Sequence, residues 1–332
     1  MRLHGLLFTV MALGFSMIIG CGRSEKQTEP VKQPGGPAQT PAKMRGTIAL
    51  SVLTLTNPFF KVIGDTMTAE AAKYGYDVIV VSGDFDAARQ QNQVKDFIVK
   101  RVSAIVLNPC DSKAIGPAIK EANDAGIPVF TADIACLAPG VKVICHVATD
   151  NYQGGRMAAD AMVEALGGKG KVAIIDHPEV ESVILRTKGF EERIAALNKQ
   201  PGVAIQILGK WPGGAVPDKS FKTALDILQS HGDLDGIFAI NDPTAFGAIA
   251  ALEKAGKAGQ VKLIAFDGQP EGKQAIKDGK IYADPIQFPD EIARKTVEVI
   301  VKHFKGEEAP KEILIPTALY RKADALKDPT LK

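Results

Sequence analysis

Amide, carboxylate and aromatic side chains recur just after short apolar segments of this chain, where they could hold a small polar ligand. Asn57 opens an Asn-Pro-Phe-Phe run that ends at Phe60, so an amide stands beside two aromatic rings. Sugar hydroxyls both donate and accept hydrogen bonds, while the C–H face of a sugar ring packs on aromatic side chains. This mixture of residue types indicates a binding site for a small polyhydroxylated molecule.

Further Asn and Asp residues follow other apolar segments. They are Asn108, Asp111, Asp133, Asn241 and Asp267. In open parallel sheets, ligands bind beyond the carboxyl ends of the strands, where connecting loops and helix N-termini converge. Each residue has a plainer alternative, because Asn and Asp also cap helices and begin turns, and for any one residue alone capping is the commoner role.

Arg186, Gln287 and Trp211 extend the set in the second half of the chain. Arginine and glutamine add hydrogen-bond donors, and tryptophan adds an aromatic face, although a plain core position is the alternative for Trp211. A hydrogen bond to a charged group contributes roughly 1.5 to 3 kcal/mol, so a handful of them supports about micromolar affinity after association entropy is subtracted.

The elements that must position these residues are short β-branched runs that alternate with amphipathic stretches. This pattern predicts parallel sheets covered by helices on both faces. One set of predicted strands covers Thr47–Leu53, Val78–Val81, Ile105–Leu107 and Val129–Thr131. A second set covers Lys171–Ile175, Ala204–Leu208, Ile237–Ile240 and Leu263–Phe266. The body after about residue 45 is too long for one ordinary core, so we expect an α/β protein with two doubly wound lobes.

The N-terminal residues have a different character. A basic start and an apolar stretch from Leu6 to Ile19, too short to span a membrane, are typical of a signal peptide, which we expect over residues 1–20. The four residues ending at Cys21 are similar to a lipoprotein processing site, so we expect Cys21 to be lipidated; an ordinary signal peptide with a chance cysteine is the alternative. Residues 21–44 are rich in Pro, Gly, Gln and Lys and predict a flexible tether.

Charge and composition argue against several classes of partner. The formal net charge is +2 over 332 residues without basic blocks, which offers no electrostatic footprint for nucleic acid and little for an anionic membrane. No second apolar stretch reaches spanning length, so we expect membrane attachment through the lipid anchor only.

Cysteine and histidine spacing does not indicate a metal site. Beyond Cys21 the chain has Cys110, Cys136 and Cys145, and the sequence leaves open whether any two of them pair. His146 lies in an apolar segment where a core position is the commoner role.

An enzyme is the main competing class, since Asp133, Asp267, Arg186 and His177 could perform acid–base chemistry in a cleft. The sequence has no phosphate-binding Gly-rich loop, no Gly-x-Ser-x-Gly elbow and no zinc helix. We therefore expect no catalysis, no metal and no cofactor.

Six segments in order along the body resemble the landmarks of ribose-binding proteins. They are Asn57–Phe60, Thr131–Asp133, Arg186–Phe190, Asn241–Asp242, Phe266–Gly268 and Gln287–Asp290. Ribose-binding proteins belong to the periplasmic sugar-binding proteins of ABC transporters, which share the type I periplasmic binding protein fold with lactose-repressor-type regulators. The secretion signal stands where such a regulator would need a DNA-reading helix, which argues against that role.

The resemblance implies a division of the ligand site between the lobes. Asn57, Phe59, Phe60 and Asp133 would contact ligand from the N-terminal lobe. Arg186, Trp211, Asn241 and Asp267 would contact it from the C-terminal lobe, with Gln287 at the hinge. Phe59 and Trp211 would sandwich the sugar ring.

The resemblance also implies that three chain crossings form a hinge between discontinuous lobes. Residues 45–148 and 287–314 would form the N-terminal lobe, and residues 149–286 and 315–325 the C-terminal lobe. Closure around the ligand would then be a hinge motion.

One departure from the resemblance concerns ligand identity. Ribose binders place an arginine directly after the aspartate that corresponds to Asp133, and this chain has Ile134. A site that lacks one charged donor should prefer another ligand, so the sequence leaves open which sugar or polyol is bound.

The sequence therefore predicts a monomeric substrate-binding lipoprotein of an ABC-type importer that captures a neutral monosaccharide or sugar alcohol and docks on permease subunits. We expect it in the periplasm or at the cell surface, and the sequence leaves open which membrane holds the anchor. The alternative is a sugar-sensing binding protein for a chemotaxis or kinase receptor.

Overall fold

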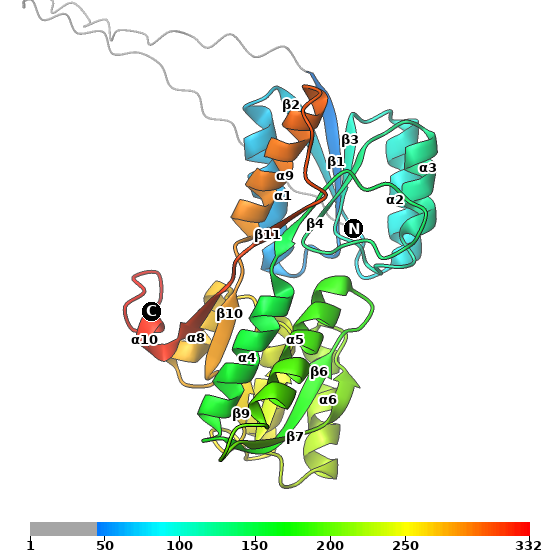
Figure 1. Ribbon diagram of the computed structural model, residues 1–332. Helices are drawn as coiled ribbons and strands as arrows, with labels where there is room; N and C mark the ends of the chain where they lie inside the picture. Colours follow the sequence, from blue (N-terminus) through cyan, green and yellow to red (C-terminus); the bar gives the residue numbers. More distant parts are fainter. Residues whose placement is uncertain (1–44) are drawn as a thin grey trace, which may run out of the picture. The chain divides into compact units, whose positions relative to one another are not determined.

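The computed structural model describes residues 45–332, and two six-stranded sheets organise them (Figure 1). The signal peptide, the lipidated Cys21 and the tether that we expect before this range lie outside the described residues. The predicted α/β architecture of two doubly wound parallel-sheet lobes is confirmed by the two sheets and the helices on them.

The first lobe is built on one sheet. Its strands are β1 (Gly46–Val52), β2 (Tyr76–Ser82), β3 (Ala104–Leu107), β4 (Val129–Ala132), β5 (His146–Thr149) and β11 (Glu312–Ile315), in the spatial order β11-β5-β4-β3-β1-β2. Helices α1 (Pro58–Ala72) and α9 (Pro289–Phe304) pack together on one side, and α2 (Ala87–Val99) and α3 (Gly116–Asp124) on the other (Figure 1).

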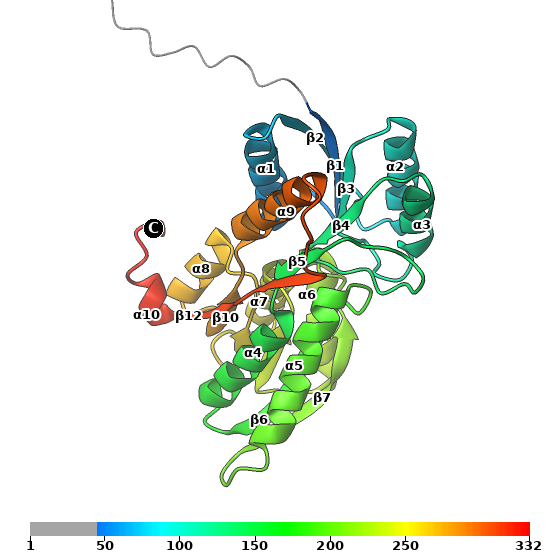
Figure 2. The same ribbon diagram turned by 45° about the horizontal axis from the view of Figure 1, so that its top comes forward.

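The second lobe repeats this plan. Its strands are β6 (Lys169–Asp176), β7 (Ala204–Pro212), β8 (Gly236–Ala239), β9 (Lys262–Ile264), β10 (Ala283–Ile286) and β12 (Ala318–Arg321), in the order β12-β10-β9-β8-β6-β7. Its helices are α4 (Asn151–Ala165), α5 (Glu181–Leu197), α6 (Pro217–Ser230), α7 (Asp242–Lys254), α8 (Pro270–Lys277) and α10 (Lys322–Ala325). Helices α4 and α5 pack as a pair, as do α6 and α7 (Figure 2). Strand pairing is parallel throughout both sheets except between β10 and β12.

Alternation along the central strands explains why both faces of each sheet are covered. In β6, Val172 and Ile174 belong to one apolar cluster and Ala173 and Ile175 to another, and all four are fully buried. Successive side chains of a strand point to opposite faces, so a strand that is apolar at every position needs helices on both sides.

The chain crosses between the sheets three times. The crossings join β5 to α4, β10 to α9, and β11 to β12. Each sheet is therefore assembled from segments that are far apart in the sequence, and the strap-like end strands β11 and β12 complete both (Figure 2).

Within residues 45–332 we looked at candidate membrane spans, the three cysteines and His146. No helix of this range has the length and apolar character needed to cross a membrane. Cys110, Cys136 and Cys145 are free thiols. His146 is buried in β5, where its Nδ1 lies 2.9 Å from the Thr131 hydroxyl, and burial lowers its pKa to about 4.

Candidate functional site

Side chains of both lobes meet beyond the carboxyl ends of the two sheets and line a cavity of about 30 Å³. This volume is smaller than the range of roughly 300 to 1,000 Å³ that is usual for small-molecule sites. Every predicted ligand residue except Trp211 lines it: Asn57, Phe59, Phe60, Asp133, Arg186, Asn241, Asp267 and Gln287. These residues come from six separate segments, which parallel strand ends bring to one place.

Helix α5, which carries Arg186, packs unusually close to α4. A Cβ added to Gly155 would lie 2.0 Å from the Arg186 carbonyl oxygen, so only glycine permits this crossing. The guanidinium donates from Nε to Asn151 Oδ1 (2.8 Å), and from Nη1 to the Ile240 carbonyl (2.8 Å) and Asp267 Oδ1 (3.1 Å). Its carbon Cζ lies 3.9 Å from the Phe266 ring centroid, so the cation is fixed before any ligand arrives.

Asp267 follows β9 and is the most heavily bonded acid in the cavity. Besides Arg186, Gln287 Nε2 donates to its Oδ1 (2.7 Å) and Gln269 Nε2 to its Oδ2 (3.3 Å). Burial still raises the pKa of Asp267, while Arg186 acts in the opposite direction. The arginine, the aspartate and the glutamine form one rigid network along the second-lobe wall.

Asp133 faces this network from the end of β4. It is 3% exposed and has a left-handed backbone (φ 63°), and its Oδ1 has no hydrogen-bond partner among the described residues. Burial raises the pKa of Asp133 to about 7, with Arg186 opposing the rise. A buried acceptor without a partner is costly, and such groups in native structures mark a role beyond stability.

Asn57 and Asn241 each cap a helix and also line the cavity, which are the two roles that the sequence left open. Asn57 Oδ1 caps α1 by accepting from Phe59 N, and Asn241 Oδ1 caps α7 by accepting from Thr244 N, each at 2.9 Å. Both residues also line the cavity. Gln269 Nε2 of the second lobe donates to Asn57 Oδ1 at 2.9 Å, so Asn57 also contacts the opposite lobe.

The first lobe contributes most of the aromatic wall. Phe59 and Phe60 are 4% exposed and pack edge to face, with ring centroids 5.2 Å apart. Ile134, where ribose binders have arginine, is buried and lines the cavity with Leu53. One wall is thus apolar and the other ionic, which suits a ligand with C–H faces and hydroxyl edges.

Trp211 is the predicted ligand residue that does not line the cavity. Strand β7 does not end at Leu208, as the sequence pattern predicts, but continues to Pro212, so Trp211 still lies in the strand, paired with Ile175. Its ring packs over Gly209 and meets His231 with centroids 5.6 Å apart, against a face of the sheet and outside the cavity. The loop beyond β7 instead presents Ala215 to the cavity.

Sequence reasoning missed Phe85 and gave His177 another role. Both line the cavity, and their rings pack edge to face with centroids 6.1 Å apart, one from each lobe. Phe85 has a left-handed backbone (φ 61°) in the turn after β2, a position that no strand-end pattern indicates. Asn108 and Asp111 are not among the lining residues: Asn108 bonds to the Ala132 carbonyl, and Asp111 caps the turn before α3.

Two fully buried carboxyl groups, Asp242 and Asp284, support the loop that carries Asp267. Asp242 Oδ2 accepts from Gln269 N (2.8 Å) and Asp284 Oδ2 from Gly268 N (3.1 Å). Burial and the neighbouring Asp284 raise the pKa of Asp242 well above its ordinary value, and burial raises that of Asp284 to about 7. The Oδ1 atoms of Asp242 and Asp284 have no other partner among the described residues, and a hydrogen bond from protonated Asp242 to Asp284 would satisfy both.

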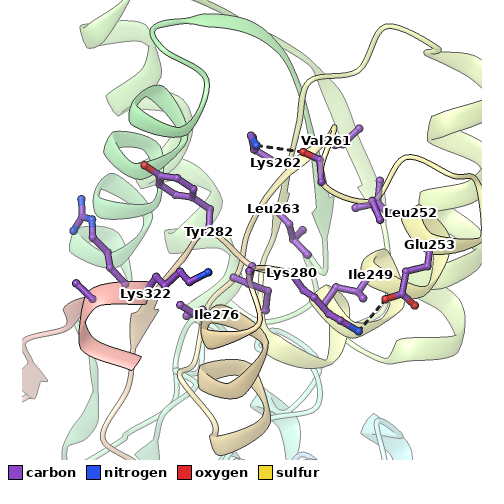
Figure 3. Close-up of a pocket in the computed structure, with 16 residues that line it drawn as sticks. Ile249, Leu252, Glu253, Val261, Lys262, Leu263, Ile276, Lys280, Tyr282 and Lys322 are labelled. Carbon is purple, nitrogen blue, oxygen red and sulfur yellow. Dashed lines mark hydrogen bonds and ion pairs between the residues drawn. The ribbon is translucent and has the colours of Figure 1, made fainter. Parts of the chain in front are cut away.

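A second and larger cavity, of about 500 Å³, lies in the second lobe (Figure 3). It is lined mainly by apolar side chains of α7, β9 and α8, and several of its polar rim residues are paired. Lys280 bonds to Glu253 (2.9 Å), and Lys262 donates to the Gly259 carbonyl (3.2 Å) (Figure 3). None of the predicted ligand residues lines this groove.

The side chains at the interlobe cavity can bind a ligand, but within residues 45–332 they include no nucleophile that is hydrogen-bonded to a base. Its acids bond to arginine, to amides or to nothing, and Ser182, a lining hydroxyl, has no hydrogen bond to a histidine among the described residues. The geometry supports hydrogen-bonded capture of a neutral polar ligand.

Comparison with known proteins agrees with this geometry. The family described as periplasmic binding protein domain matches residues 48–308. The chain is 37% identical over 268 residues to the ribose import binding protein of Salmonella typhimurium, covering 80% of this chain and 88% of that protein. It is 35% identical over 287 residues to a D-apiose import binding protein of Paraburkholderia graminis, covering 86% and 90%.

Solved structures with bound ligands share the fold. A solute-binding protein of Actinobacillus succinogenes with bound D-allose superposes with a TM-score of 0.77 at 29% identity, covering 86% of this chain and all of that one. A Caulobacter myo-inositol binding protein superposes with a TM-score of 0.78 at 28% identity, covering 88% and 98%. These proteins are described as solute-binding proteins, in agreement with the binding role that the sequence predicts. From its fold, its interlobe cavity and these relatives, we conclude that the chain belongs to the periplasmic binding protein family, in its ribose-binding-like branch.

Proposed function

We propose that the protein is the substrate-binding component of an ABC-type importer and holds a neutral monosaccharide or sugar alcohol in the interlobe cavity. The observation that carries this proposal is a pair of cavity acceptors, Asp133 Oδ1 and Gln287 Oε1, which have no partner among the described residues and share the cavity with the fixed Arg186. Hydroxyl groups are donors that would satisfy both acceptors, and they also accept from a guanidinium. Relatives named for ribose, D-apiose and D-allose support a sugar as the ligand.

Eight residues form the proposed ligand shell. Asn57, Phe59, Phe60 and Asp133 act from the first lobe, and Arg186, Asn241, Asp267 and Gln287 act from the second lobe and its junction. A ligand without net charge suits them, because Arg186 already has a carboxylate partner at 3.1 Å. An anionic solute would have to compete with Asp267 for that cation.

Calorimetry tests the ligand class. D-Ribose, D-apiose, D-allose, myo-inositol and, as a control, L-leucine would be titrated into the purified protein. We expect at least one of the four polyols to bind at about micromolar affinity, since a handful of charged hydrogen bonds supports that strength, and L-leucine not to bind. Tight binding of the amino acid and of none of the polyols would contradict the proposal.

We propose that residues 45–148 with 287–314, and residues 149–286 with 315–325, move as two lobes about the three crossings. Contacts between them support a closed arrangement: Gln269 bonds to Asn57, and Ser112 Oγ accepts from Glu181 N at 2.9 Å. Ligand then stabilises this arrangement by bonding to both lobes. Small-angle scattering should show a smaller radius of gyration with saturating ligand, and identical curves would contradict closure.

We further propose that Cys21 carries a lipid after removal of residues 1–20, which would hold the protein in the periplasm or at the cell surface for delivery to permease subunits as a monomer. The sequence before Cys21 supports this proposal. Mass spectrometry of the membrane fraction should find diacylated Cys21, and Cys21→Ala should release the protein into the soluble fraction. Retention of that variant on the membrane would contradict the anchor.

A further inference from the structure

His177 is the cavity residue whose chemistry the proposed function does not yet use. It stands directly after β6, lines the interlobe cavity, and is 8% exposed. Its Nε2 is buried and has no hydrogen-bond partner within residues 45–332. Burying a polar nitrogen without a partner costs free energy comparable to a lost hydrogen bond, so its retention calls for a partner from outside the chain.

The surroundings fix which hydrogen bond Nε2 makes. Nδ1 lies 2.7 Å from Glu179 Oε2, a carboxylate that can only accept, so the ring proton of the neutral imidazole stands on Nδ1. Nε2 is then an acceptor with an available lone pair. Burial lowers the pKa of His177, which keeps the ring in this neutral form at pH 7, although Glu179 acts in the opposite direction.

The position of the ring is set from both lobes. His177 N donates to Asp176 Oδ1 (2.9 Å), which also accepts from the Thr187 hydroxyl (3.0 Å), so the backbone at the strand end is locked. Phe85 of the first lobe packs edge to face against the imidazole. A ring restrained on three sides presents its remaining atom in a defined direction, which is what selective recognition of one hydroxyl requires.

We propose that His177 is a ligand-binding residue, and that its Nε2 accepts a hydrogen bond from one hydroxyl of the bound sugar or polyol. The inference rests on the proposed sugar-binding function and adds a specificity determinant to it. The ligand must carry a donor at the carbon that faces His177, so a deoxy or fluoro analogue at that carbon binds more weakly, because hydrogen and fluorine donate no hydrogen bond.

Binding of modified ligands to a histidine variant tests this assignment. The tightest binder among D-ribose, D-allose and myo-inositol would be titrated into the wild type, together with each of its monodeoxy and monofluoro analogues. His177→Leu keeps the apolar contact with Phe85 but removes Nε2, and His231→Leu is the matched control, since His231 packs on Trp211 outside the cavity.

We expect one position of the sugar to be sensitive to His177. Its deoxy and fluoro analogues should bind about 10-fold more weakly than the parent to the wild type and to His231→Leu, and equally well to His177→Leu. The same penalty at every position in His177→Leu as in the wild type would overturn the inference while leaving sugar binding intact. Failure of these three compounds and of D-apiose to bind the wild type would instead overturn the proposed function.

A spectroscopic measurement on the wild type keeps the inference testable if His177→Leu does not fold. The chain has five histidines, so the imidazole nitrogen signals in an NMR spectrum of ¹⁵N-labelled protein are few enough to assign. Ligand should shift the acceptor nitrogen of His177 upfield, as a new hydrogen bond to it does, and leave His146 unchanged. An unshifted His177 nitrogen at saturation would overturn the inference.

Discussion

The interlobe cavity and the groove of the second lobe differ in whether their polar atoms have hydrogen-bond partners. The groove is the larger space, about 500 Å³ against about 30 Å³, but its Lys280, Glu253 and Lys262 have partners at 2.9 to 3.2 Å (Figure 3). In the cavity, Asp133, His177 and Gln287 each keep a buried atom that has no partner within residues 45–332.

This difference separates a binding site from an incidental space. Folding satisfies buried polar groups wherever it can, because each unsatisfied one costs roughly 1–3 kcal/mol. Three unsatisfied acceptors in one cavity therefore support the proposed hydroxyl-bearing ligand, whereas the largely apolar groove gives no such support.

The largest effect is expected from breaking one ion pair in the interlobe cavity and, for comparison, one at the groove. Arg186→Ala leaves Asp267 buried without its cation, so we expect no detectable sugar binding in calorimetry and a loss of about 3–5 kcal/mol in urea unfolding. Lys280→Ala breaks the half-exposed pair at the groove and should change neither quantity measurably. Equal effects of the two substitutions would remove the distinction.

A second test separates binding from stability at a single atom. Asp133→Asn removes a buried charge whose Oδ1 is unpartnered, while asparagine tolerates the left-handed backbone. We expect ligand affinity to fall about 10-fold, and the melting temperature of the ligand-free protein to stay equal or rise. A clear drop in the ligand-free melting temperature would show that Asp133 stabilises the fold.

The acids beneath the cavity should make stability depend on pH. Burial raises the pKa of Asp284 from 3.8 to about 7, so between these values the folded state holds a proton that the unfolded state has released. Stability contributed by this group is therefore present at low pH and is lost as pH rises through about 7. Asp284→Asn should flatten the change in melting temperature between pH 5 and pH 8, and exposed Asp65→Asn should not. Parallel profiles for the wild type and Asp284→Asn would contradict the assignment.

The smallest expected effect comes from filling the groove. Ile249→Trp places a larger apolar side chain in that space, which lacks unsatisfied polar atoms at its rim. We expect unchanged sugar affinity and a shift in unfolding free energy of less than about 1 kcal/mol. A change in affinity of more than threefold would mean that the groove communicates with the cavity.

Strand patterns and strand-end residues were readable from the sequence. The eight predicted strands correspond to β1–β4 and β6–β9, because buried parallel strands are continuous β-branched runs. Strands β10, β11 and β12 were not predicted as strands, since β10 contains Pro285 and the other two are only four residues long and each include a charged residue. Tertiary pairing, rather than local pattern, makes them strands.

Site residues on loops were harder to predict than those at strand ends. Asn241 and Asp267 follow apolar runs directly, but Phe85 and Ala215 lie in turns whose direction depends on positive-φ backbone at each of them. Trp211 was misplaced because Gly209 to Pro212 carry no strand pattern, yet pair with β6 after a register shift. A bulge of this kind reverses which side chains face the helices, and short-range patterns do not reveal it.

The order of strands in the first sheet has a consequence for biosynthesis. Strand β5 pairs with β11, whose Glu312 lies opposite His146, so the partner of this edge is made after more than 160 intervening residues. While the ribosome is still adding the second half of the polypeptide, the amide groups along β5 have no neighbour there. The first lobe therefore reaches its final form only when translation is almost over, and folding of the two halves is completed together.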